Sequence, residues 1–254
     1  MQPAPSASTY GRLNPFPATL LENRLLSGRN SGKEVRHIVF DLAGSGLTYR
    51  VGQSLGVQPV NAPQDVVDLL QAGHGFCATD MVMLPKATAP VELKDALTSQ
   101  LFLGSPTKKF VELLLVSATD AVEKQTLENL LKPESAEALS KFLEECFFID
   151  LFEEFPKAGA KITAQQLVDC MKKLQPRLYS IASSPKMTGD HVELTVAIVR
   201  YETNGRRRNG VCSSYMADRI AIGAKAGVFV GESPFKLTED DNAPIIMVGP
   251  GTGI

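Results

Sequence analysis

One stretch decides the fold of this chain: Arg177-Leu178-Tyr179-Ser180-Ile181-Ala182-Ser183-Ser184-Pro185. It places a guanidinium, a phenol ring and several hydroxyls on a segment that reads as a β-strand. An arginine can grip a phosphate with two parallel hydrogen bonds, and a tyrosine ring can stack on a flat ligand. An ordinary polar edge strand could have the same composition, so the order of the residues carries the prediction.

A second motif, Gly210-Val211-Cys212-Ser213, follows further along the chain. A glycine followed by small residues and an apolar helical stretch suits a helix N-terminus that faces an anion. Such junctions are common, so this motif alone is a weak signal. Cys212 has no partner cysteine nearby in the sequence, and we expect a small residue close to a ligand rather than a redox centre.

Hydropathy patterns place strands on both sides of a helical region. Residues 34–42 and 191–199 alternate polar and apolar side chains, which is typical of half-buried strands. Between them, 135–143 carries an apolar helical stripe, and Thr163 and Gln166 form a capping-box pattern. We therefore predict a mainly β fold, an antiparallel β-barrel, with an α-helical insertion. Further strands are predicted at 47–51, 52–57, 227–231 and 244–248.

The bulk composition argues against several classes of protein. The net charge of −2 is unlike that of a nucleic-acid binder, and no apolar run approaches the ~18 residues of a membrane span. Arg206-Arg207-Arg208 follows the hairpin signal Asn204-Gly205, so we expect these three side chains to be exposed to solvent at the tip of a hairpin. The four cysteines form no CxxC pair, which disfavours a disulfide scaffold or a metal site. We expect a reduced, cytoplasmic protein that binds neither nucleic acid nor membrane.

The order of residues in this stretch resembles the flavin-binding strand of the ferredoxin–NADP reductase superfamily. The residues that carry the resemblance are Arg177, Tyr179, Ser180 and Ser183. The resemblance implies that Arg177 binds the FAD pyrophosphate and that Tyr179 stacks on the isoalloxazine ring. It also implies that Ser180 donates a hydrogen bond near the flavin N5. Tyr179 and Ser180 are thus the residues expected to support catalysis.

The same resemblance implies further FAD contacts. Residues 210–213 look like the second FAD motif of the superfamily, whose backbone N–H groups and serine hydroxyl hold the pyrophosphate. Residues 195–197 lie where related reductases contact FAD, although a plain core strand explains Val196 and Ala197 equally well, and Tyr201 matches another flavin-contacting position. The expected cofactor-binding residues are Arg177, Leu178, Tyr179, Ser180, Thr195, Val196, Ala197, Tyr201, Gly210, Val211, Cys212, Ser213 and Thr252.

A glycine-rich turn, Gly249-Pro250-Gly251-Thr252-Gly253, follows the last predicted strand. Glycines let backbone N–H groups approach a phosphate closely. The turn resembles the opening of the superfamily's NADPH-binding domain, where Thr252 would line the nicotinamide and pyrophosphate path. Because the sequence ends at Ile254, we expect only the first strand of a truncated nucleotide-binding α/β domain and an NADPH site that is mostly missing.

The long insertion before Arg177 resembles the connecting domain of diflavin reductases, a group that includes nitric oxide synthase reductase domains and sulfite reductase flavoproteins. The latter branch aligns best. We expect a flexible lead-in, an FAD-binding barrel, a helical connecting insertion and the start of an NADPH-binding domain. Their predicted bounds are 1–15 for the lead-in, 16–61 with 175–240 for the barrel, 62–174 for the insertion and 241–254 for the NADPH-binding start.

The resemblance implies an FAD-dependent NADPH reductase that passes electrons to a redox partner. The first choice of partner is a sirohaem iron–sulfur hemoprotein that reduces sulfite to sulfide. No flavodoxin-like domain precedes residue 16, so FMN is expected on a separate protein or not at all. Two alternatives stay open: an FAD-holding electron-transfer module without its own NADPH site, and a diflavin-type reductase for another haem protein or flavodoxin.

Overall fold

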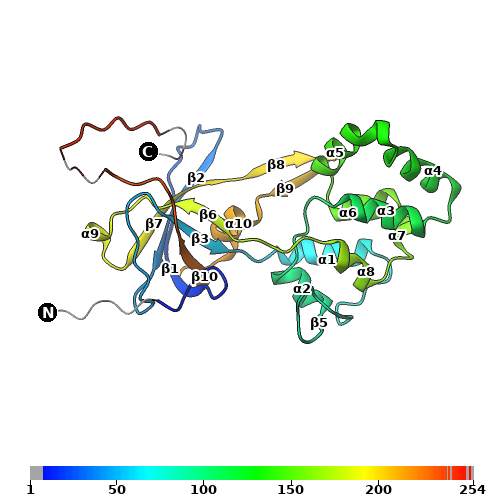
Figure 1. The fold of residues 1–254 in the computed structure, drawn as a ribbon, viewed down its shortest axis with the longest axis horizontal. Helices are drawn as coiled ribbons and strands as arrows, with labels where there is room; N and C mark the ends of the chain where they lie inside the picture. Colours follow the sequence, from blue (N-terminus) through cyan, green and yellow to red (C-terminus); the bar gives the residue numbers. More distant parts are fainter. Residues whose placement is uncertain (1–7, 239, 241, 250–251, 253–254) are drawn as a thin grey trace. The chain divides into compact units, whose positions relative to one another are not determined.

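The structure, a computed structural model, describes residues 8–238, 240, 242–249 and 252. The chain forms two compact units (Figure 1). The first contains the residues up to Pro59, Gln175–Arg200 and the residues from Asn209 onward. The second contains Val60–Leu174 and Tyr201–Arg208. Each unit has its own hydrophobic core.

The first unit is built on a six-stranded sheet in which every neighbouring pair is antiparallel. An isolated bridge between Ile181 and Leu194 joins its two edge strands at one end. This arrangement confirms the predicted antiparallel β framework. In sheet order the strands are β6 (Arg177–Ser180), β3 (Ser54–Gln58), β10 (Lys225–Gly231), β1 (Phe16–Leu25), β2 (Glu34–Asp41) and β7 (His191–Ile198).

Strand β7 shows why these residues form a sheet over a core. Val192, Leu194 and Val196 are buried, while the residues between them face outward. This alternation follows from the two-residue period of a strand. The short helix α10 (Val211–Ser214) and the π-helical turn that follows it, η2 (Tyr215–Arg219), add Cys212 and Met216 to the same core. The helix α9 (Pro185–Thr188) lies between β6 and β7.

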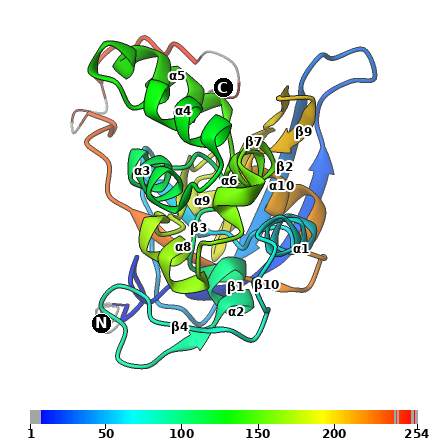
Figure 2. The same cartoon turned by 90° about the vertical axis from the view of Figure 1, so that its right-hand side faces the viewer.

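The second unit is helical (Figure 2). Its core includes Phe110, whose ring packs edge-on against Phe148 and Phe152 at centroid distances of 4.9 and 5.4 Å. The capping box predicted at Thr163 is confirmed, since its side chain and that of Gln166 each accept from the other's backbone N–H. The helices are α1 (Pro63–Ala72), α2 (Leu93–Ser99), α3 (Lys108–Ser117), α4 (Ala121–Leu130), α5 (Ala136–Glu145), α6 (Phe148–Glu154), α7 (Pro156–Gly159) and α8 (Ala164–Cys170), with a 3₁₀ turn η1 (Pro133–Ser135).

Two short pairs of strands complete the architecture. Strand β4 (Met81–Val82) pairs with β5 (Val91–Glu92), and β8 (Arg200–Thr203) pairs with β9 (Arg206–Asn209). The β8–β9 hairpin is anchored within the second unit, where the Thr203 hydroxyl and the Asn204 amide donate to the Glu145 carbonyl. The residues that the structure describes include no helix with the length and apolar composition needed to cross a bilayer.

Two predicted strands are absent. Residues 47–51 form none, because Tyr49 turns into the core and the Arg50 N–H donates to the Gln53 side chain instead of to a neighbouring strand. Residues 244–248, predicted as the first strand of a nucleotide-binding domain, also form none, and Met247 is 86% exposed. A strand requires a partner for its N–H and C=O groups, and no strand pairs with 244–248 among the described residues.

The N-terminal segment makes specific contacts where the structure describes it. The Ser8 hydroxyl donates to the Ser45 carbonyl at 2.8 Å, and the Tyr10 ring packs edge-on against Phe16. Residues 1–7 of the predicted lead-in lie outside the described residues. Pro250, Gly251 and Gly253 of the predicted glycine-rich turn do so as well.

Candidate functional site

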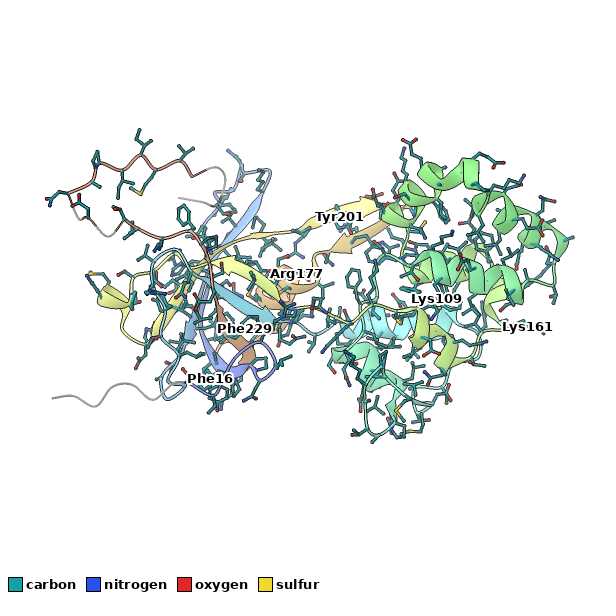
Figure 3. The ribbon with its side chains drawn as sticks, viewed as in Figure 1. Phe16, Lys109, Lys161, Arg177, Tyr201 and Phe229 are labelled. Carbon is teal, nitrogen blue, oxygen red and sulfur yellow. The ribbon has the colours of Figure 1, made fainter. Side chains whose placement is uncertain are left out.

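Strand β6 presents the first predicted motif at the edge of the sheet. Antiparallel pairing with β3 aligns Arg177 with Val57 and Tyr179 with Leu55. Arg177, Leu178 and Ser180 are exposed, whereas Tyr179 is half-buried against the core. Among the described residues, no carboxylate forms an ion pair with Arg177, whose place on β6 is labelled in Figure 3. Its guanidinium is therefore available to an anion.

The second motif forms a tight junction between β7 and α10. The Gly210 N–H donates to the Val199 carbonyl at 2.8 Å, and the Ser213 hydroxyl accepts from the Val199 N–H at 3.2 Å. A side chain at position 210 would lie 2.7 Å from both the Ser213 hydroxyl and the Val199 Cβ, so only glycine fits there. The N–H groups of residues 211–213 have no acceptor within their own helix, as in any first helical turn. They can therefore donate hydrogen bonds to an anion.

Ser213 has a structural role at this junction. Its side chain is buried, and its hydroxyl donates to the Gly210 carbonyl at 3.3 Å while accepting from Val199. The resemblance assigns this hydroxyl to the pyrophosphate. Because the Ser213 hydroxyl already has two backbone partners, the backbone N–H groups of the motif are better placed than this hydroxyl to donate to a pyrophosphate.

The two motifs meet at the sulfur of Cys212. The side chain is 2% exposed, and its thiol donates to the Val57 carbonyl at 3.6 Å. Val57 is the ladder partner of Arg177, and Tyr179 packs against the core cluster that contains Cys212. Residues that are far apart in the sequence thus form one cluster within the first unit.

Burial raises the pKa of both side chains of this cluster, which are protonated at neutral pH. It raises the pKa of the Cys212 thiol to about 11. Burial, followed by the proximity of Cys212, raises the pKa of the Tyr179 phenol far above its ordinary value. At neutral pH the cluster therefore presents one cation, Arg177, and several neutral hydrogen-bonding groups.

The third predicted segment lies on β7. Val196 is 1% exposed in the core, so only its backbone can reach a ligand, and the core-strand explanation accounts for its side chain. Thr195 and Ala197 alternate with it and point to the opposite face, with Ala197 exposed. The structure therefore brings residues 177–180, 195–197 and 210–213 together in one compact unit.

Among the described residues, no hydrogen bond or ion pair joins the two remaining predicted residues to these segments. Tyr201 is on β8 in the second unit and is 47% exposed (Figure 3). Thr252 is exposed in the C-terminal segment. Their assignment to a cofactor stays a prediction.

Sequence reasoning missed Tyr49. Its buried hydroxyl donates to the His191 carbonyl at 2.9 Å and also bonds the hydroxyls of Ser183 at 2.7 Å and Thr188 at 3.0 Å. Ser183 in turn accepts from the Glu193 N–H at 3.0 Å, so the last serine of the first motif orders the chain after β6. A sequence signal existed, because a tyrosine inside a core usually finds a partner for its hydroxyl.

These residues fit a flavin dinucleotide. Its pyrophosphate needs a cation and free N–H groups, which Arg177 and the 211–213 backbone provide. Its ring system needs a flat aromatic surface, which the half-buried Tyr179 provides. Among the described residues, no group of three or more His, Cys, Asp or Glu side chains could hold a metal ion.

Comparison with known proteins agrees with this geometry. The family described as FAD binding domain matches residues 10–215. The sulfite reductase [NADPH] flavoprotein alpha-component of Bacillus subtilis is 40% identical over 259 residues, covering 99% of this chain and 42% of that protein. The protein of that name from Mannheimia succiniciproducens is 38% identical over 250 residues, covering 98% of this chain and 40% of its own length. The chain thus spans about two fifths of these curated relatives. Since the matching region covers most of the sequence, the chain belongs to the FAD binding domain family.

Proposed function

We propose that this chain holds FAD as the flavin module of an NADPH-dependent reductase. The observation that carries the proposal is the hydrogen bond from the Cys212 thiol to the Val57 carbonyl. Because Val57 is the ladder partner of Arg177, this contact places the strand of Arg177 close to the first turn of α10. Arg177 and the N–H groups of 211–213 bind the pyrophosphate. Tyr179 stacks on the isoalloxazine ring, and Ser180 donates a hydrogen bond near N5.

FAD supplies the chemistry of accepting a hydride and releasing electrons singly. The residues of the chain bind and orient it. A tyrosine phenol is uncharged at neutral pH, and burial raises the pKa of Tyr179 further, so no negative charge builds up beside the ring. Cys212 stays protonated for the same reason and acts through its hydrogen bond rather than as a nucleophile.

The electron donor and acceptor follow from the relatives. Those proteins carry the name sulfite reductase [NADPH] flavoprotein alpha-component, so we assign NADPH as the donor. The final acceptor we assign is a sirohaem iron–sulfur hemoprotein that reduces sulfite to sulfide. Thr252 belongs to the NADPH path in this assignment. The four cysteines are free thiols, one of them exposed, which suits a reducing compartment such as the cytoplasm.

A second candidate is an FAD-holding electron-transfer module without its own NADPH site. One observation favours it: the segment 244–248, where the NADPH-binding part would begin, forms no strand and is exposed. Both candidates require FAD and differ only in the donor.

The experiment is a flavin spectrum followed by an anaerobic NADPH titration of the purified chain. We expect bound FAD, identified by its visible absorbance and its mass, and bleaching by NADPH. A chain that cannot be loaded with FAD would rule out the proposal. Bound FAD that dithionite bleaches and NADPH does not would favour the second candidate. Arg177→Ala should bind FAD more weakly, whereas Arg207→Ala, which removes an exposed arginine of β9, should bind it as the parent chain does.

A further inference from the structure

The buried hydroxyl of Tyr49 lies where the two edge strands of the first unit, β6 and β7, come together. The side chain is 5% exposed. Its hydroxyl bonds the Ser183 hydroxyl at 2.7 Å, just after β6, and donates to the His191 carbonyl at 2.9 Å, at the start of β7. The hydroxyl of Thr188, on α9 between these strands (Figure 1), is 3.0 Å away. One side chain thus contacts three points of the connection from β6 to β7.

The hydrogen bonds around Tyr49 form a chain with a defined direction. A carbonyl can only accept, so the Tyr49 proton goes to His191. The Tyr49 oxygen is then left to accept from the Ser183 hydroxyl, and the Ser183 oxygen accepts in turn from the Glu193 N–H at 3.0 Å. Removing the Tyr49 hydroxyl therefore takes away the acceptor of the Ser183 proton.

The three residues after β6 close the sheet, because they pair with β7 at its opposite edge. The Ile181 N–H donates to the Gln53 carbonyl at 3.1 Å, and the Ala182 N–H donates to the Glu193 carbonyl at 2.8 Å. The Glu193 N–H returns the pairing to the Ser183 side chain, which replaces a backbone acceptor. The last bond of this closure therefore depends on how the Ser183 hydroxyl is oriented.

Ser180 comes immediately before this closing segment. It is the last residue of β6, it is exposed, and it ends the ladder with β3 opposite Ser54. Beyond this point no ladder holds the strand, so a shift of the segment at Ser183 reaches Ser180 first. Arg177 lies at the other end of β6 and is separated from the segment by the whole strand.

We infer that Tyr49 is a positioning residue for the flavin: through Ser183 it holds the end of β6 and so fixes the position from which the Ser180 hydroxyl donates near N5. This inference rests on the proposed function, in which Ser180 is the partner of N5. It separates two tasks along β6, since Arg177 determines how tightly FAD binds and Tyr49 determines how its ring is hydrogen-bonded.

The test compares the visible spectra of FAD-loaded variants, because hydrogen bonds to the ring nitrogens tune the electronic properties of a flavin. Tyr49→Phe removes the acceptor of the Ser183 proton, and Ser180→Ala removes the donor near N5. We expect the absorption maximum to shift in the same direction in both, and less in Tyr49→Phe. Adding Tyr49→Phe to Ser180→Ala should cause no further shift, because Tyr49 acts through Ser180.

Ser183 supplies the conservative rescue. Ser183→Ala should reproduce the spectrum of Tyr49→Phe, whereas Ser183→Thr, which keeps a hydroxyl, should retain the parent spectrum. The matched control is Tyr10→Phe, which removes the same atom from a tyrosine that packs against Phe16 and whose hydroxyl forms no hydrogen bond within the described residues. This control should change no readout.

Two further readouts separate positioning from general stability. Amide exchange at Ala182 in the FAD-loaded chain should be about threefold to tenfold faster in Tyr49→Phe, the range of one net hydrogen bond, while the amides of β10 keep the parent rates. The Kd of FAD should stay within about twofold of the parent value, because Arg177 lies at the other end of β6.

A parent-like spectrum in Tyr49→Phe would overturn the inference, as would additive shifts in the combined variant. Faster exchange throughout the sheet with an unchanged spectrum would limit Tyr49 to a role in stability and overturn it as well. If Tyr49→Phe does not fold, Ser183→Ala decides by the same criteria.

The parent chain and Ser180→Ala distinguish this inference from the proposed function. A parent chain that binds no FAD would remove the proposed function, and the inference with it. A parent chain that binds FAD, with a Ser180→Ala variant whose spectrum is unchanged, would remove the inference and the role of Ser180 while leaving the FAD site.

Discussion

Strands β6 and β9 both carry arginines, and the structure uses them in opposite ways. On β6, Arg177 is exposed and has no carboxylate partner among the described residues. On β9, Arg208 is 9% exposed, donates to both oxygens of Asp150 at 2.5 and 2.6 Å, and lies 4.1 Å from the centroid of the Phe147 ring. The first arginine is available to a ligand, and the second is part of the architecture.

The comparison corrects the prediction for Arg206-Arg207-Arg208. A solvated tip was expected at 206–208, but only Arg207 fits that description. Arg206 pairs with Glu153, and Arg208 is buried against Asp150. Burying a guanidinium is costly unless an acid faces it, so the acids on α6 decide the role of these arginines. Within the part of the chain that the structure describes, no acid pairs with Arg177, and its charge stays available.

Removal of Arg208 is the most damaging change we predict. Arg208→Ala leaves the Asp150 carboxylate buried and should lower the free energy of unfolding by about 3 kcal/mol. Arg206, whose Nε lies 3.4 Å from Asp150, limits the loss. Urea denaturation measures it, and a loss below about 1 kcal/mol would contradict a structural role for this pair. The uncharged pair Asp150→Asn with Arg208→Gln should recover part of the loss.

Arg177→Ala should affect binding instead of folding. Loss of charge-assisted hydrogen bonds to the pyrophosphate should raise the Kd of FAD about tenfold to a hundredfold. The free energy of unfolding of the apoprotein should change by less than about 0.5 kcal/mol, because the side chain is exposed. Fluorescence titration and urea denaturation measure the two quantities. An unchanged Kd would contradict the role of Arg177, and Arg177→Lys should recover only part of the affinity.

The loss of unfolding free energy in Arg206→Ala should lie between the losses in Arg208→Ala and Arg177→Ala. Arg206 is 36% exposed and its partner Glu153 is 50% exposed, so water screens the pair. We expect a loss of about 0.5–1 kcal/mol that shrinks as salt is added. Urea denaturation at low and high salt checks this. A loss as large as that of Arg208→Ala would show that both arginines are structural to the same degree.

Arg207→Ala should have the smallest effect. Its side chain is exposed between two paired arginines. We expect a change in unfolding free energy within about 0.5 kcal/mol and no change in the Kd of FAD. A loss of FAD affinity in this variant would break the comparison, because it would show that charge on β9 also contributes to the cofactor site.

Local features of the sequence were enough to predict much of the fold and the motifs of the candidate site. The alternation in β7, the capping box at Thr163 and the glycine at 210 depend on a few consecutive residues, whose geometry the chain itself dictates. The segment 47–51 misled the prediction because it has the same alternation. Its backbone is satisfied by the Gln53 side chain, a choice that hydropathy does not show.

The sequence by itself determined the chemical types available: an arginine, a tyrosine and a glycine-led helix start in a recognisable order. Only the tertiary structure decided which of them meet. The Cys212 thiol donates to the Val57 carbonyl, and the buried Arg208 pairs with Asp150, through contacts between residues far apart in the chain. Burial and partnership depend on what packs opposite a side chain, and a linear pattern does not contain that information.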